Sequence, residues 1–281
     1  MIKKLLLGFV LLISLVSSYS YTNISSCGIF LASNQEYKFN DTIYSNSSSS
    51  CININSGNTN ISIDCQGNKL ISNQSTGFTS IFSVSDILIE NCYLENTRES
   101  FRIRGSSTNV TLNNITIVNN NGRSIFLEAA LNSYFYNITI INTSEAFTTL
   151  SDFSNNNTFK DIYIDNSTIG FFLSGSNNIY NNVNIVDTTT PITISTPSNA
   201  FTVITNSRLG NTSTWTNINR LNVTSTLFER NFYDNYNGTT PFCIYQSICD
   251  SFPNNTFSNI KENTFTLGYL LLPIILMLYF L

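Results

Sequence analysis

The sequence predicts an all-β protein: a right-handed parallel β-helix with an N-terminal cap and a C-terminal transmembrane helix. Three observations support this fold class. The chain repeats with a period near 23 residues, apolar and polar residues alternate within each repeat, and an apolar stretch lies at each end. Only 11% of the 281 residues are charged, there is no His, and 43 residues are Asn. The missing His excludes Ser-His-Asp and Cys-His catalysis and most zinc sites.

The N-terminus has the pattern of a secretory signal peptide over residues 1–20. Lys3 and Lys4 precede an apolar run over residues 5–16, and Ser18-Tyr19-Ser20 places small residues before a cleavage site. An uncleaved N-terminal anchor is the alternative, but the apolar run is short for a membrane span. We therefore expect an exported protein.

Internal repetition is the strongest signal in the sequence. One polar column, here called the Asn91 column, recurs at spacings of 23, 23, 24, 21 and 24 residues: Asn91, Asn114, Asn137, Asp161, Asn182 and Asn206. Apolar residues lie two positions before and three positions after each member. The Asn96 column lies five residues later: Asn96, Asn119, Asn142, Asn166, Asp187 and Asn211. The Asp86 column lies five residues earlier: Asp86, Asn109, Asn132, Asn156 and Asn177.

The repeat predicts stacked coils. Each unit holds two or three short strands, and one unit cannot bury its inner face alone. Stacking successive coils about 4.8 Å apart places equivalent side chains over one another. Asn suits the corners because it tolerates a left-handed backbone, and stacked amides can bond to one another. Two other folds fit the sequence less well. A leucine-rich repeat has a similar period but needs a Leu-dominated signature, which this sequence lacks. A β-sandwich has short strands but would not keep a fixed period.

These patterns define five segments of the chain. We expect a signal peptide at 1–20, an N-terminal cap at 21–58 and a β-helix of seven to eight coils at 59–235. A C-terminal cap and linker follow at 236–262, and a hydrophobic membrane anchor at 263–281.

The anchor is predicted from an uncharged run that follows Glu262. Seventeen to 19 residues span roughly 26 to 28 Å as a helix, enough for the hydrocarbon core of a bilayer. The same run also fits a removable lipid-anchor signal with Ser258 or Asn259 as the attachment site. Both kinds of anchor remain open from the sequence.

The six cysteines support export, because an even number of cysteines in an exported protein indicates disulfides. The coil register brings Cys65 and Cys92 onto adjacent coils, within disulfide range. Cys243 with Cys249 is also favoured among the 15 pairings that six cysteines allow.

Three stretches of the chain, SSCGIF, SSCININSGNTNISIDCQGNKLIS and ILIENCYLEN, carry a resemblance. They resemble exported right-handed β-helix proteins of the NosD-like or carbohydrate-binding and sugar-hydrolase type, in the pectate-lyase-like superfamily, and especially archaeal surface proteins. The resemblance covers Cys27 to Asn211. It implies that the segment from Cys27 to Cys51 caps the first coil and that these two cysteines pair.

The resemblance also implies where an active site would lie, with acidic groups on an outer sheet and, in lyases, calcium and an arginine base. A glycosidase needs two carboxylates within about 10 Å. The acids here are scattered singly, and the best cluster is Glu99, Arg102, Arg104, Arg123, Glu128 and Asp152. We expect Arg104 and Glu128 to stack directly, and an exposed ion pair explains them more simply than catalysis. No paired Asp, cofactor motif or metal motif is apparent.

Fifteen N-x-S/T sequons are present. Seven lie in the columns, where a partly buried amide would be structural: Asn109, Asn114, Asn137, Asn142, Asn156, Asn166 and Asn211. Seven outside the columns are the better glycan acceptors: Asn23, Asn40, Asn46, Asn73, Asn222, Asn237 and Asn254.

The expected partners are the membrane and cell-surface glycans or envelope proteins. Thirteen scattered Lys and Arg residues exclude a nucleic-acid surface. Outward aromatic residues are either sugar-stacking groups or ordinary strand residues: Tyr93, Phe126, Tyr136, Tyr163 and Phe172. The sequence favours a structural, adhesive or glycan-binding surface role, with a surface polysaccharide lyase or hydrolase as the alternative.

Overall fold

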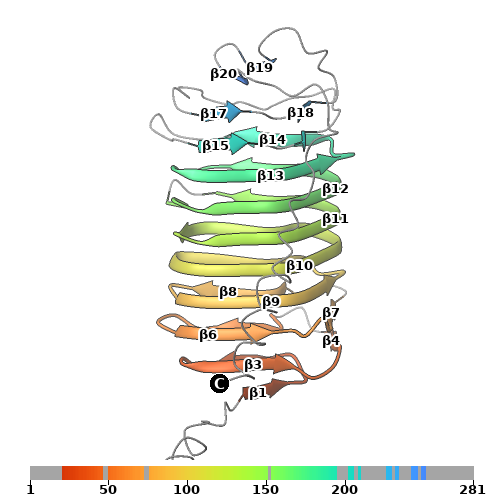
Figure 1. Ribbon diagram of the computed structural model, residues 1–281. Helices are drawn as coiled ribbons and strands as arrows, with labels where there is room; N and C mark the ends of the chain where they lie inside the picture. The colour runs from red at the N-terminus through yellow and green to blue at the C-terminus, as the bar shows by residue number, and fades with distance from the viewer. Residues whose placement is uncertain are drawn as a thin grey trace, which may run out of the picture.

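The computed structural model describes residues 21–46, 50–72, 76–150 and 153–194, together with six later strands up to Asp250. The strands are β1 (Tyr21–Ile24), β2 (Ile29–Leu31), β3 (Gln35–Phe39), β4 (Ile43–Ser45), β5 (Ile52–Ile54), β6 (Thr59–Asp64), β7 (Lys69–Ser72), β8 (Thr76–Phe82), β9 (Ser85–Glu95), β10 (Glu99–Leu131), β11 (Tyr134–Thr149), β12 (Thr158–Leu173), β13 (Asn178–Val186), β14 (Thr190–Ile194), β15 (Thr202–Thr205), β16 (Arg208–Leu209), β17 (Thr226–Glu229), β18 (Phe232–Tyr233), β19 (Phe242–Tyr245) and β20 (Ile248–Asp250). They stack as a β-solenoid of about seven turns (Figure 1). Among the described strands, only β19 and β20 pair antiparallel.

Each coil has three faces, named here by their place in the register. The first face precedes the Asn91 column and includes the row Asn113, Tyr136 and Lys160. The second face follows that column and includes the row Thr116, Thr139 and Tyr163. The third face contains β2, β5 and β8, and continues in the row Ile125, Phe147 and Phe171. Coils therefore stack through parallel strand pairs along all three faces, with register shifts between Phe101 and Ile103 and between Asn120 and Arg123.

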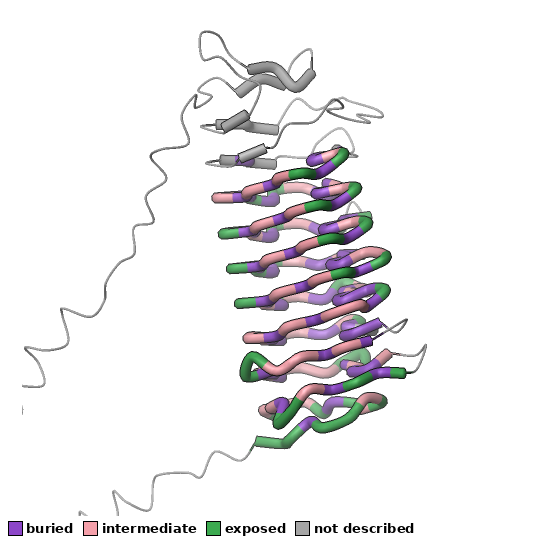
Figure 2. The backbone as a smooth tube through the Cα atoms, turned by 90° about the vertical axis from the view of Figure 1, so that its right-hand side faces the viewer, coloured by how far each residue is buried: buried purple, intermediate pink, exposed green. Residues whose placement is uncertain are grey.

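The interior is built from the alternating apolar residues of every strand, and buried and exposed positions alternate along each coil (Figure 2). The predicted column two residues before each corner is buried throughout: Ile89, Leu112, Phe135, Phe159, Tyr180 and Ile204. Rings stack along it, with centroid distances of 4.8 Å from Phe135 to Phe159 and 4.5 Å from Phe159 to Tyr180. Equivalent side chains therefore pack on one another, as the repeat predicts.

The three polar columns form the corners between the faces. Every described member has a left-handed backbone, with φ between 44° and 58°. Nδ2 of Asn114 donates to Oδ1 of Asn91 at 2.8 Å, and Asn137 donates in the same way to Asn114 at 3.1 Å. Asn182 donates to Asp161 at 2.6 Å. The predicted corner role and amide ladder are confirmed for these residues, and Asn206 lies outside the described residues.

The predicted partial burial of the sequon amides in these columns is wrong. The six described ones are exposed: Asn109, Asn114, Asn137, Asn142, Asn156 and Asn166. A corner residue in the left-handed conformation turns its side chain to the outer edge of the stack, so its bonds run along the surface. There, hydrogen bonds from Asn109, Ser85 and Thr59 lower the pKa of the Asp86 carboxyl, and the bond from Asn109 has the largest effect.

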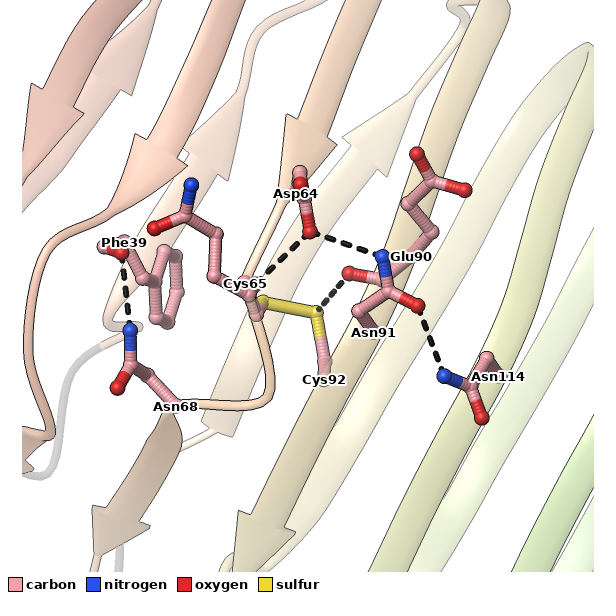
Figure 3. Close-up of a disulfide and its surroundings, with 9 residues drawn as sticks. Phe39, Asp64, Cys65, Asn68, Glu90, Asn91, Cys92 and Asn114 are labelled. Carbon is pink, nitrogen blue, oxygen red and sulfur yellow. Dashed lines mark hydrogen bonds between the residues drawn. A yellow bond between two sulfur atoms is a disulfide. The ribbon is translucent and has the colours of Figure 1, made fainter.

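The structure contains both disulfides predicted within the described residues. Cys27 pairs with Cys51 at a Cα separation of 4.2 Å, and Cys65 pairs with Cys92 at 4.9 Å. Figure 3 shows the second bond beside the start of the amide ladder, where Asn91 donates to Asp64 at 2.9 Å. Farther along the chain, β19 and β20 place Cys243 opposite Cys249, whose side chains are not among those described.

The parallel stack begins earlier in the sequence than the boundary predicted at residue 59. Strand β1 pairs with β3, β2 with β5, and β3 with β6, so residues 21–46 already form coils of the solenoid. Equivalent residues here are 15 apart from Tyr21 to Glu36 and 26 apart from Gln35 to Ile61, so this part of the sequence has no fixed period. The predicted signal peptide and anchor, with Asn73, Asn222, Asn237 and Asn254, lie outside the described residues. Within the described parts, no helix is long and apolar enough to cross a bilayer.

Two adjacent isoleucines test the inside-outside alternation. Ile140 is fully buried, whereas Ile141 is only partly buried on the outer side of the same strand. We expect Ile140→Ala to lower the free energy of unfolding by about 2–5 kcal/mol because it leaves a cavity in the core. Ile141→Ala should cost less than about 1 kcal/mol. Urea unfolding followed by circular dichroism measures both, and equal losses would contradict the assigned strand orientation.

Asn114 offers a test of the corner. Asn114→Ala forces alanine into the left-handed region, which costs about 1–2 kcal/mol beyond the lost amide bonds. Asn114→Gly loses the same bonds but adopts this φ freely. We expect the alanine variant to be the less stable by about 1 kcal/mol in denaturant unfolding. A glycine variant that is equally unstable would show that the corner does not depend on backbone conformation.

Candidate functional site

The charged cluster predicted from the sequence lies on the third face, along β10. Phe101 and Ile103 point into the core and are fully buried. Arg102 and Arg104 alternate with them and therefore lie on the outer side. The next coil repeats the pattern, so its charged residues lie on the same outer surface.

Glu99, Arg102, Arg123 and Phe126 form a closed cluster on this surface. The Glu99 carboxylate lies 3.2 Å from the Arg123 guanidinium and 3.5 Å from that of Arg102. Both guanidiniums lie over the Phe126 ring, at 4.1 Å for Arg123 and 5.3 Å for Arg102. Glu99 is only 6% exposed and Phe126 only 2%. The cluster therefore links two coils and leaves neither a free carboxylate nor an open aromatic face.

The expected pair of Arg104 and Glu128 does not form: among the described residues, no ion pair joins them. The Arg104 guanidinium lies instead 5.8 Å from the centroid of the Phe82 ring. Phe82 is the register partner of Arg104 in the preceding coil, so its ring is directly available to the cation. Asp152 lies outside the described residues.

Catalysis by the predicted residues is therefore not favoured by their arrangement. The structure brings Glu99 together with Arg102 and Arg123, and leaves Arg104 and Glu128 outside that cluster. Because two guanidiniums already hold the Glu99 carboxylate, it is not free to act on a substrate. In the described parts of the chain, no three acidic, Cys or His side chains converge on a point that would hold a metal ion.

An open aromatic pair lies on the first face. Tyr134 and Tyr136 both point outward from β11, and their rings stack with centroids 5.9 Å apart and planes 26° apart. Tyr134 is 37% exposed. Burial, with a smaller effect from Tyr134, raises the pKa of the Tyr136 hydroxyl, so this hydroxyl stays protonated near pH 7. We call Tyr134 and Tyr136 the tyrosine platform.

Polar side chains border the tyrosine platform in register. Asn113 and Lys160 lie on either side of Tyr136, and Thr111 and Thr158 on either side of Tyr134. Of these, Lys160 is exposed and the others are partly exposed. The platform thus combines two ring faces with hydrogen-bonding groups. Tyr134 was missed by sequence reasoning, although two tyrosines spaced two residues apart on a strand share a face.

The other predicted aromatic residues are less accessible. The Tyr93 ring is covered by Lys69, whose Nζ lies 4.4 Å from the ring centroid and 3.3 Å from Glu95. The Tyr163 hydroxyl donates to Asp165 at 3.3 Å. Phe172 is partly buried in register with Thr148. Of the five predicted aromatic residues, only Tyr136 joins an open stacked pair.

The charged cluster predicts a contribution to stability. Glu99→Gln leaves the Arg102 and Arg123 guanidiniums without their anion, and we expect a loss of about 1–3 kcal/mol in the free energy of unfolding. Glu95→Gln breaks the more exposed pair with Lys69 and should cost less than about 1 kcal/mol. Thermal unfolding of the two variants makes the comparison. Equal effects would show that the cluster is no more than a surface ion pair.

Comparison with known proteins identifies the fold family. The family model for the right-handed β-helix region matches residues 62–208, just over half of the chain. No curated protein and no solved structure matches the sequence significantly. The match covers the coils that carry the polar columns, the Glu99 cluster and the tyrosine platform. The stacked parallel coils and this match together show that the chain belongs to the right-handed β-helix family.

Proposed function

We propose that this protein is a non-catalytic cell-surface β-helix that binds glycans through the tyrosine platform. The observation that carries the proposal is the stacked, outward-facing pair of Tyr134 and Tyr136. Flat aromatic faces stack on the apolar faces of sugar rings, and neighbouring polar groups orient the hydroxyls. Asn113 and Lys160 supply such groups beside Tyr136.

The proposed location rests on the two disulfides and on the chain ends. Cys27–Cys51 and Cys65–Cys92 are stable in an oxidising compartment, which agrees with export. The signal-peptide pattern at residues 1–20 and the uncharged run at 263–281 support a mature protein held to the membrane by its C-terminus. The stacked coils would then project the platform from the membrane.

A binding role is preferred to the lyase or hydrolase alternative because of the Glu99 cluster. Glu99 is held by two arginines, and Phe126 is covered by them. The tyrosine platform, in contrast, has no carboxylate in register beside either ring: its neighbours are Thr111, Thr158, Asn113 and Lys160. Such a surface can hold a sugar but offers no acid and base pair to cleave it.

The platform is tested with the full-length protein in detergent on a broad glycan panel. We expect Tyr134→Ala with Tyr136→Ala to weaken binding of the best ligand at least tenfold, measured by isothermal titration calorimetry. Tyr44→Ala is the matched control, because Tyr44 is 70% exposed on β4, several coils away. Circular dichroism checks the fold of each variant.

Three outcomes would contradict the proposal: no binding to any glycan of the panel, an equal loss in the Tyr44 variant, or cleavage of a bound glycan by the wild-type protein. The last outcome would favour the enzymatic alternative.

A further inference from the structure

The first coil leaves the N-terminal end of the stack open. Within the described strands, β1 pairs only with β3, β2 only with β5, and β4 only with β7. Strands β3 and β6, in contrast, pair on both sides. Figure 1 shows β1 at this end of the stack. One backbone edge on each of the three faces therefore has no strand beside it among the described residues.

The three strands at this open end are aromatic and uncharged. None of β1, β2 and β4 contains a charged residue or a proline. Each carries one exposed ring: Tyr21 is 49% exposed, Phe30 66% and Tyr44 70%. Nζ of Lys38 lies 4.3 Å from the centroid of the Tyr21 ring. A free strand edge without charge or proline is a template for pairing with another molecule, so this end needs a cover.

Three sequons gather at the same end of the stack. Asn23 lies in β1, Asn40 lies between β3 and β4, and Asn46 directly follows β4. All three residues are exposed. The backbone N–H of Asn40 donates to the carbonyl of Ile24 at 3.4 Å, so Asn40 lies beside the end of β1. Within the described residues, none of the three side-chain amides forms a hydrogen bond, so each Nδ2 is accessible.

The described sequons farther along the stack differ from these three. They lie at corners with a left-handed backbone: Asn60, Asn109, Asn114, Asn137, Asn142, Asn156 and Asn166. Five of them donate from Nδ2 to the equivalent side chain of the preceding coil, at 2.6 to 3.1 Å: Asn60, Asn109, Asn114, Asn137 and Asn142. A sugar on Nδ2 would disturb this ladder. Bulky sugars on consecutive corners, about 4.8 Å apart, would also collide.

We propose that N-linked glycans on Asn23, Asn40 and Asn46 cover the open first coil and block end-to-end pairing of two molecules. A transferase supplies each glycan from a lipid-linked oligosaccharide diphosphate. The bond from sugar C1 to Nδ2 forms, the bond from C1 to the diphosphate oxygen breaks, the amide loses one proton, and the lipid diphosphate leaves. Bulky, hydrated sugars beside β1 and β4 then keep other strands away. The proposal rests on the proposed export and uses none of the platform residues.

The modification is tested on the full-length protein made in secretory cells that transfer N-glycans. Glycopeptide mass spectrometry should find sugar on Asn23, Asn40 and Asn46 and none on the five ladder amides. Ser25→Ala destroys the Asn23 sequon while retaining the asparagine, and should remove one glycan. Ser25→Thr is the matched control, because it changes the same exposed residue but keeps the sequon, and should retain that glycan.

The covering role is tested by self-association of the full-length protein in detergent. Sedimentation velocity over a range of concentrations should show the wild-type glycoprotein as a monomer. A triple variant, Asn23→Gln with Asn40→Gln and Asn46→Gln, should shift to dimers or larger species. Adding Thr22→Lys to the triple variant should restore the monomer without any sugar, because a charge on an edge strand opposes pairing. Circular dichroism checks that each variant keeps its strands.

Several results would overturn the inference. An exported protein without sugar on the first coil, or with sugar only on the ladder amides, would reject these sites and leave the proposed function intact. A triple variant that stays as monomeric as the wild type would show that the glycans do not keep the ends apart. Association that Thr22→Lys does not reverse would place the contact away from β1. Failure to enter the secretory pathway would contradict the proposed location, and this inference with it.

Discussion

In-register stacking of one coil on the next is the constraint on which the rest of the structure depends. A single coil of short strands buries too little apolar surface to be stable, so each coil relies on its neighbours. Leu112 pairs with Phe135 on the first face and Ile125 with Phe147 on the third, with one shift of register between Asn120 and Arg123. Because each interior position faces its equivalent above and below, the same type of residue must recur there. The repeat in the sequence is the direct result.

The corners meet a second requirement, which is a sharp change of direction three times in each coil. Asn and Asp supply it through a left-handed backbone at every described position of the three columns. Their side chains are then free to form a ladder along the edge of the stack, as Asn91, Asn114 and Asn137 do. The low charge and high Asn content of the chain therefore reflect corner chemistry in a folded solenoid.

Function is left to the outward positions, which the stacking does not constrain. Membership of the right-handed β-helix family fixes the scaffold but not the ligand, since one fold carries many activities. The outer faces carry two different arrangements: a closed ion cluster at Glu99 and an open ring pair at Tyr134 and Tyr136. The first joins coils, and the second carries the proposed ligand site.

The sequence by itself determined the coil period, the three corner columns, the buried columns and the pairing of Cys65 with Cys92, because equal spacing places equivalent residues on one line. It also indicated which side chains point outward. It did not determine what these side chains contact. Only the tertiary structure showed that Arg102 and Arg123 lie over Phe126. It also showed that Arg104 contacts Phe82 instead of Glu128, and that the corner amides are exposed. The physical reason is that periodicity fixes the side of a strand, whereas contacts between long side chains depend on rotamers and on the neighbouring coils.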